Sequence, residues 1–85
     1  MRVVRRMTSR DHLEEVRRQI LDRDKRSWTI TEYGGDPDVF RTECVTPLQI
    51  LQQQGCFEIR EIYTYARGRK YVSRIDIISA VNLDL

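Results

Sequence analysis

The sequence predicts a single α+β domain with the element order α-β-β-α-β-β, in which two helices pack on one face of a four-stranded antiparallel sheet. Apolar residues recur at helical spacing near the start of the chain, four segments alternate between apolar and polar residues, and turn residues separate these segments. A chain of 85 residues is long enough for one domain. We therefore assign residues 8–85 to the domain and expect residues 1–7 to form a flexible basic arm.

The first expected element is a helix over about residues 9–24. Leu13, Val16 and Ile20 recur at helical spacing. This apolar stripe is narrow, so the helix is expected to lie on the surface and to pack by one edge. Three candidate N-terminal capping residues stand at the start of the segment: Thr8, Ser9 and Asp11.

Two strands are expected next, as an antiparallel pair. Residues 27–33 alternate and are rich in β-branched and aromatic residues, which is typical of a strand. Residues 34–37 read Gly-Gly-Asp-Pro and predict a turn. Residues 39–45 are expected to form the second strand.

A short second helix is expected over residues 46–54. Thr46 stands where an N-cap would lie, Pro47 occupies the first helical position, and Gln49 follows at the third. Gly55 suits the position just past the C-terminal end of this helix.

The last two expected strands form a hairpin over residues 56–66 and 70–78, joined by a turn at residues 67–69. Alternation predicts that Tyr63 and Tyr65 point toward the core while Arg60, Lys70 and Arg74 point outward. The expected core face consists of Trp28, Ile30, Phe40, Cys44, Phe57, Ile59, Tyr63, Tyr65, Tyr71, Ile75 and Ile77.

Charge is unevenly distributed along the chain, although the formal net charge is only +2. Residues 1–26 hold nine basic and five acidic side chains, residues 27–55 hold one and four, and residues 56–85 hold five and four. The start is therefore basic and the middle acidic, and both regions are candidates for contact with a partner. The acidic candidates are Glu32, Asp36, Asp38 and Glu43.

Basic residues and tyrosines alternate in the predicted hairpin, a pattern that suits phosphate contact and base stacking. The expected strand register weakens this interpretation, because it places the tyrosine rings and the charges on opposite faces. The residues expected to bind a partner, with the N-terminal three as a mobile arm, are Arg60, Arg67, Arg69, Lys70, Arg74, Arg2, Arg5 and Arg6.

Toward the end of the chain, apolar residues recur at odd positions: Ile75, Ile77, Val81, Leu83 and Leu85. Such a stripe is typical of an edge strand, which can pair with a second copy of the chain or with another protein. The alternative is that this segment covers the core of its own chain. The residues of the candidate dimer edge are Val81, Leu83 and Leu85.

No catalytic residue, cofactor or metal site is expected. The single histidine, His12, falls in the first turn of a predicted helix, and the two cysteines with one histidine are too few for a zinc site of the usual kind. Cys44 and Cys56 are expected to be reduced and partly buried, with a disulfide between them as the alternative. Small toxin ribonucleases of the RelE type are similar in size and use Arg, Lys and Tyr for catalysis, although that family places two helices before its sheet. This similarity implies a catalytic set of Arg60, Arg67, Arg69 and Tyr71.

Apolar stretches run only two or three residues, so no membrane-spanning helix is expected, and the predicted location is the cytoplasm. The sequence predicts a small non-catalytic regulator or inhibitor that docks on another protein or nucleoprotein complex. In size and composition it is similar to Arg-rich phage and mobile-element proteins, including anti-CRISPR proteins. A nucleic-acid-binding domain is the alternative function, and a toxin-type ribonuclease is a third.

Overall fold

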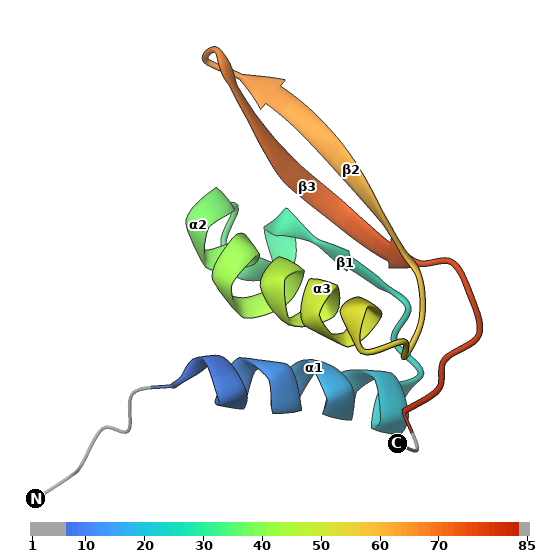
Figure 1. Ribbon diagram of the computed structural model, residues 1–85. Helices are drawn as coiled ribbons and strands as arrows, with labels where there is room; N and C mark the ends of the chain where they lie inside the picture. The colour runs from blue at the N-terminus through green and yellow to red at the C-terminus, as the bar shows by residue number, and fades with distance from the viewer. Residues whose placement is uncertain (1–6, 84–85) are drawn as a thin grey trace, which may run out of the picture.

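The chain forms an α+β domain with one antiparallel sheet, as a computed structural model that describes residues 7–83 shows (Figure 1). The sheet has three strands, β1 (Ser27–Thr29), β2 (Ile59–Ala66) and β3 (Arg69–Ile77). Their order is β1-β3-β2, so β3 lies in the centre. The α+β class and the antiparallel pairing are confirmed, whereas the prediction of four strands is wrong.

The first helix, α1 (Ser9–Arg23), agrees with the prediction of a helix over residues 9–24. The Thr8 hydroxyl accepts a hydrogen bond from the Asp11 backbone N–H, and the Asp11 carboxylate accepts one from the Thr8 backbone N–H at 2.8 Å. This reciprocal capping box satisfies two backbone donors that the helix itself leaves unpaired. The helix ends at Asp24, which adopts a left-handed conformation.

The predicted second strand over residues 39–45 is instead helical. The segment comprises α2 (Pro37–Phe40), a π-helical turn η2 (Arg41–Val45) and α3 (Thr46–Gln53), which follow one another without a break. Its beginning is fixed by the Asp36 carboxylate, which accepts hydrogen bonds from the backbone N–H groups at the start of α2.

Proline explains the π-helical turn. Pro47 lacks the N–H that an α-helix would direct to the Glu43 carbonyl, and its ring would collide with that carbonyl. The chain widens here, and the Thr46 N–H bonds to the Arg41 carbonyl five residues earlier. The predicted helix over residues 46–54 is therefore present, but Thr46 lies inside a longer helical run and does not cap it.

The predicted strand over residues 27–33 is also shorter than expected. After β1 the chain turns into a short 3-10 helix, η1 (Ile30–Tyr33). The Glu32 carboxylate accepts a hydrogen bond from the Thr29 backbone N–H at 2.6 Å, which closes this helix at its start. Gly34, with φ of 72°, ends it in a left-handed conformation that glycine adopts without strain.

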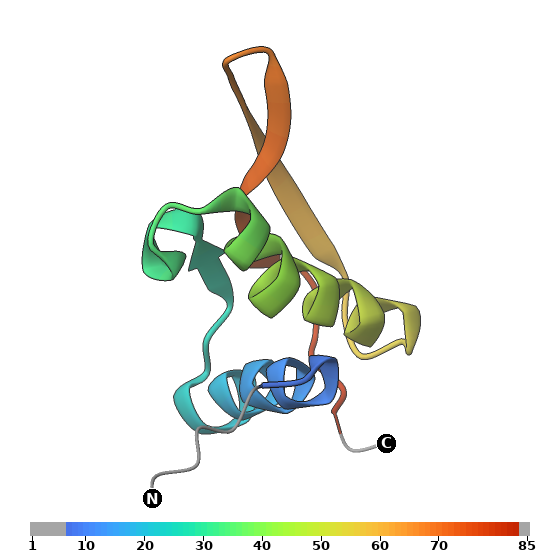
Figure 2. The same ribbon diagram turned by 90° about the vertical axis from the view of Figure 1, so that its left-hand side faces the viewer.

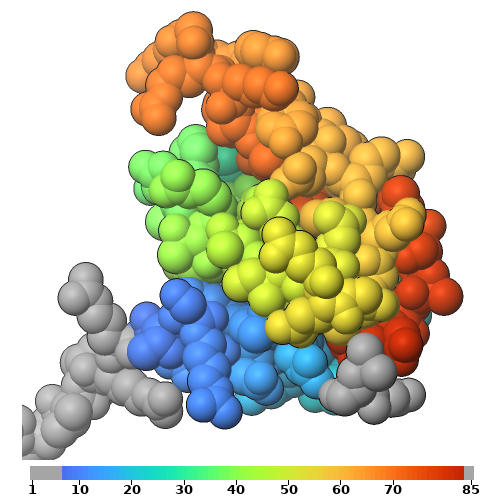
Figure 3. Space-filling model, in the orientation of Figure 1, coloured from blue at the N-terminus to red at the C-terminus, as the bar shows by residue number. Residues whose placement is uncertain are grey.

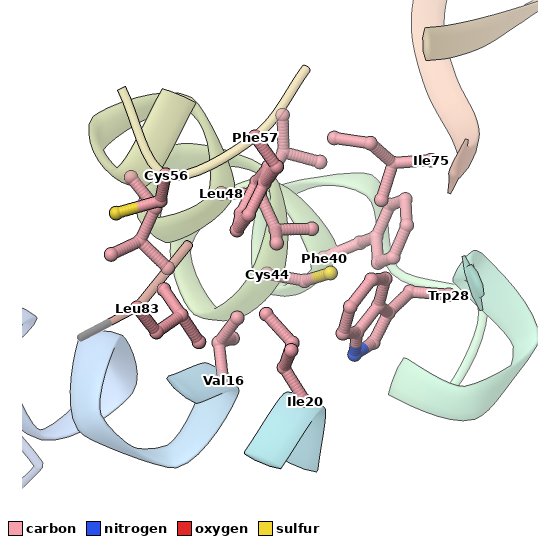
Figure 4. Close-up of a cluster of buried hydrophobic side chains, with 12 residues drawn as sticks. Val16, Ile20, Trp28, Phe40, Cys44, Leu48, Cys56, Phe57, Ile75 and Leu83 are labelled. Carbon is pink, nitrogen blue, oxygen red and sulfur yellow. The ribbon is translucent and has the colours of Figure 1, made fainter. Parts of the chain in front are cut away.

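The helices lie on one side of the sheet, in two layers (Figure 1). The helical run from α2 to α3 contacts the sheet, and α1 packs against the other side of this run. The core lies between these layers and takes buried residues from most elements (Figure 4). Its members are Val16, Ile20, Trp28, Phe40, Cys44, Val45, Leu48, Leu51, Cys56, Phe57, Ile75 and Leu83.

Strands β2 and β3 form a hairpin that extends past the helices as a twisted ribbon (Figure 2). Arg67 and Gly68 form its two-residue turn with φ of 52° and 74°, as the type I′ turn requires. A bulge interrupts the pairing next to Ile62 and Tyr63, so Ser73 has no direct partner on β2.

The end of the described chain covers the core of its own molecule. Leu83 is buried, Val81 packs against the core, and the Asn82 N–H donates to the Cys56 carbonyl at 2.7 Å. Residues 78–83 form no strand, contrary to the expectation of an edge strand. Leu85 lies outside the described residues, and pairing of this segment with a second chain remains a prediction.

Cys44 and Cys56 are both free and buried, so the alternative of a disulfide between them is not realised. Across residues 7–83, no helix is long and apolar enough to cross a membrane.

Candidate functional site

Tyr63 and Tyr65 of the hairpin are exposed, which corrects the prediction that they belong to the core, whereas Tyr71 is half-buried. Tyr63 is 44% exposed and Tyr65 is 73% exposed. Tyr63 points toward the helices, as predicted. Its hydroxyl donates a hydrogen bond to Glu61 at 3.0 Å, and the Glu61 carboxylate also accepts a hydrogen bond from Gln49 on α3. The rings remain bare because the hairpin extends beyond the helical layer that would cover them.

The bulge brings a cation to the face that carries these rings. Directly opposite residues of an antiparallel pair lie on the same face, and Tyr65 pairs with Lys70 while Tyr63 pairs with Val72. The Lys70 ammonium accordingly lies 4.3 Å from the centre of the Tyr63 ring. The expectation that Lys70 and the tyrosines lie on opposite faces is therefore wrong.

The turn of the hairpin adds two further cations. Arg67 and Arg69 are exposed, and within residues 7–83 neither guanidinium lies within ion-pair distance of a carboxylate. Lys70 likewise contacts a ring and no described carboxylate. The end of the hairpin thus presents three positive charges that the described part of the chain leaves uncompensated.

The other two predicted partner-binding arginines of the hairpin have a structural role. Arg60 and Arg74 lie 3.5 Å and 3.0 Å from the two carboxylate oxygens of Asp76, which is 7% exposed. Burial raises the pKa of Asp76, but hydrogen bonds from Ser27 and Arg74 and the charge of Arg74 outweigh it and lower the pKa overall. These two arginines therefore neutralise a buried charge and lie on the opposite face from Tyr63.

A cleft of about 470 Å³ separates the end of the hairpin from the helical run (Figure 3). One wall is a helix face that carries Pro37, Arg41 and Val45 at four-residue spacing, together with Asp38. The facing wall comes from the hairpin and includes Tyr63, Tyr71, Val72, Arg67, Arg69 and Lys70. The cleft thus combines aromatic rings and aliphatic side chains with four cations and a single carboxylate.

Sequence reasoning missed the helical wall of this cleft, because it assigned residues 39–45 to a strand. The signal was present in the spacing of the residues now found buried, Phe40, Cys44 and Leu48, which recur every four positions. The same spacing relates Pro37, Arg41 and Val45 on the face toward the hairpin.

Three of the four acidic candidates make local contacts. Glu32 pairs with Lys25 at 2.6 Å and caps η1, Asp36 caps α2, and Asp38 lies 3.4 Å from Arg41. Burial raises the pKa of Glu32, and the hydrogen bonds from Lys25 and Thr29 lower it by more. Glu43 is partly buried on η2.

Other chemistry-bearing residues lie apart from the cleft. His12 is in the first turn of α1. Burial raises the pKa of Cys44 to about 12, although a hydrogen bond from Tyr33 opposes the shift, so this thiol stays protonated at neutral pH. In the part of the chain described, no group of three or more His, Cys, Asp or Glu residues is placed to hold a metal ion. Arg2, Arg5 and Arg6 lie outside the described residues.

Comparison of the chain with protein-family models, with curated proteins and with solved structures finds no match.

Proposed function

We propose that this domain is a non-catalytic nucleic-acid-binding protein and that the end of its β2–β3 hairpin makes the contact. The observation that carries the proposal is the pair of bare rings, Tyr63 and Tyr65, beside three cations without a described acidic partner. Cations that neutralise phosphates supply most of the affinity for nucleic acid, and exposed aromatic rings add stacking on bases.

The shape of the hairpin supports this function. A two-stranded ribbon that extends from the body of a domain reaches a nucleic-acid backbone without hindrance from the helices. Arg67 and Arg69 lie at its turn, where long side chains have the greatest reach. Such a partner also agrees with the cytoplasmic location and the regulatory role that the sequence predicts.

The positions of the charged residues around the cleft support the non-catalytic part of the proposal. Arg67, Arg69 and Tyr71 line the cleft, but Arg60, the fourth member of the toxin-type set, is held by Asp76 on the other face of the sheet. The only carboxylate of the cleft, that of Asp38, pairs with Arg41.

The test is a binding measurement with labelled single-stranded RNA and DNA of about 12 nucleotides at about 50 mM salt. Changing Arg67, Arg69 and Lys70 together to serine is expected to weaken binding at least about tenfold, because three phosphate contacts are lost. The matched control changes Arg10, Arg17 and Arg23 of α1 to serine, which removes the same charge elsewhere. Equal losses in both variants, or no binding by the unmodified chain, would contradict the proposal.

A regulator that docks on another protein is the second candidate, and the free edge of β2 favours it. The strand pairs only with β3, so its other edge offers unpaired backbone groups along residues 60–66, and Ile62 is 38% exposed there. Charged neighbours such as Arg60 and Glu61 are typical of edges that are protected against pairing. Retention of a discrete host protein by the immobilised chain, with nucleic acid digested, would favour this candidate.

A further inference from the structure

The cleft between the hairpin and the helical run differs in chemistry from the rest of the described surface. Tyr63 and Val72 share the hairpin face that is turned toward the helices and lie across the cleft from Val45 and Pro37, so its interior is aromatic and aliphatic. Arg41, Arg67, Arg69 and Lys70 border the same space from both walls. At about 470 Å³, the cleft falls within the size range of sites for small ligands and is large enough for one nucleotide unit.

The π-helical turn helps to form this cleft. It widens the helix by one residue immediately before Pro47, and its first and last residues, Arg41 and Val45, both line the cleft. Interruptions of this kind occur frequently at functional sites, because they change the direction of neighbouring side chains. Here the cation Arg41 and the aliphatic side chain of Val45 lie opposite Tyr63.

The combination of groups specifies the ligand chemistry. A flat apolar body fits between the rings and the aliphatic wall, and negative charge must lie next to it to meet the cations. A nucleotide within a strand has both features, because its base is planar and phosphates flank it on either side. A base inside a duplex is stacked and paired, so its faces cannot reach such a cleft.

We infer that the cleft receives one unpaired base of a nucleic-acid strand, stacked on Tyr63, while Arg41, Arg67 and Arg69 bind the flanking phosphates. Lys70, which now covers one face of the Tyr63 ring, is placed to move to a phosphate when the base enters. The inference rests on the proposed function and adds that the domain selects single-stranded or unpaired regions over duplex.

The test compares four labelled probes of one sequence at low salt: single-stranded RNA, single-stranded DNA, the DNA duplex, and a single strand in which abasic sites replace the bases. The inference predicts about tenfold tighter binding of either single strand than of the duplex or the abasic strand. The ratio of RNA to DNA affinity then reports whether a 2′-hydroxyl is contacted, and either result supports the inference.

The variant Tyr63→Leu is expected to lose this preference and to keep its affinity for duplex, because leucine preserves apolar volume but not a stacking face. Leu21→Ala is the control, since it removes an exposed apolar side chain from α1, away from the cleft. Crosslinking of a strand containing 4-thiouridine gives a readout without substitution, with adducts expected at Tyr63.

The outcomes separate the inference from the proposed function. Equal binding of all four probes, together with loss of affinity when Arg67, Arg69 and Lys70 are changed, overturns the inference and leaves the proposed function standing. No binding of any probe at low salt overturns both and favours a protein partner.

Discussion

Arg67 occupies a backbone conformation that disfavours its own residue type. Its φ of 52° is left-handed, and the first position of a type I′ turn is usually Asn or Gly. A residue with a large side chain loses about 1 kcal/mol in this conformation. Stability therefore does not explain an arginine here, whereas the proposed contact with nucleic acid would.

Changing Arg67 to Asn is expected to raise the free energy of unfolding by about 0.5–1 kcal/mol, because asparagine tolerates positive φ. The same change is expected to weaken nucleic-acid binding several-fold through the loss of one cation. Urea denaturation and fluorescence anisotropy measure the two effects. Arg69→Asn is the control, since it removes the same charge at a strand position and relieves no turn strain. A variant that is less stable yet binds normally would contradict this interpretation.

Asp76 makes a pH-dependent contribution to stability. Its pKa in the folded chain lies below the ordinary value of 3.8. A carboxyl with a depressed pKa stabilises the fold fully above that ordinary value, and this contribution disappears as the pH falls through the folded pKa.

Asp76→Asn is therefore expected to lower the free energy of unfolding by about 1–3 kcal/mol at pH 7, because Arg60 and Arg74 lose their partner. The difference from the unmodified chain should shrink as the pH falls from about 5 to about 2. Urea denaturation across this range measures it, and Asp38→Asn, which removes an exposed carboxylate, should show almost no effect. If the free energies of unfolding of Asp76→Asn and the unmodified chain differ by the same amount at every pH, the ion pairs are not the cause of the difference.

At the level of elements, local signals predicted the first helix and the last hairpin but failed between residues 30 and 45. Val39, Phe40, Thr42 and Val45 favour a strand by type, and tertiary packing overrode that preference. The four-residue spacing of the buried side chains and the Asp-Pro pair at the helix start were the signals to follow. Pro47 was correctly associated with a helix, but its position in a continuous run requires the π-helical turn, which spacing alone does not reveal.

The hairpin shows a second limit of prediction from sequence. Alternation gave the direction of Tyr63 correctly, but burial depends on whether another element covers that direction. The bulge at Ser73 reverses which face each β3 residue between it and the turn occupies. Lys70 therefore lies on the same face as Tyr63 and Tyr65, and Tyr71 lies on the face opposite Ile75. The sequence therefore indicated which tyrosines and cations form the candidate site, but it wrongly predicted that they lie on opposite faces of the hairpin.

The C-terminal segment provides an element-scale prediction about stability. Leu83→Ala is expected to lower the free energy of unfolding by about 2–4 kcal/mol, because the side chain fills part of the core. Ile78→Ala is the control, since Ile78 is half-exposed. Denaturation measures the loss, and sedimentation of the same variants tests the predicted dimer edge. A shift from dimer to monomer with little loss of stability would mean that this segment acts between chains.

At the scale of the whole molecule, the net charge of +2 understates how positive the hairpin end is. Many carboxylates of the described chain are held in local contacts, including Glu15 with Arg18, Glu32 with Lys25 and Asp76 with two arginines. The uncompensated cations gather at the end of the β2–β3 hairpin. The molecule is therefore electrostatically polarised toward the cleft.

The polarisation predicts how binding depends on salt. Each phosphate that a cation neutralises on a single strand contributes about 0.7 to the slope of log affinity against log salt. Changing Arg67, Arg69 and Lys70 should reduce the magnitude of that slope by about 2, and removing residues 1–6 should reduce it by about 2 again if the arm contacts phosphates. An unchanged slope in the hairpin variant would mean that its cations do not meet phosphate.

The most direct test of the central claim is a nuclear magnetic resonance titration of the labelled chain with an unlabelled single strand. The account predicts that backbone and ring signals shift at residues 63–72 and at Arg41, and that signals of α1 stay in place. Shifts along α1 or confined to residues 59–62, with the hairpin end unmoved, would contradict it.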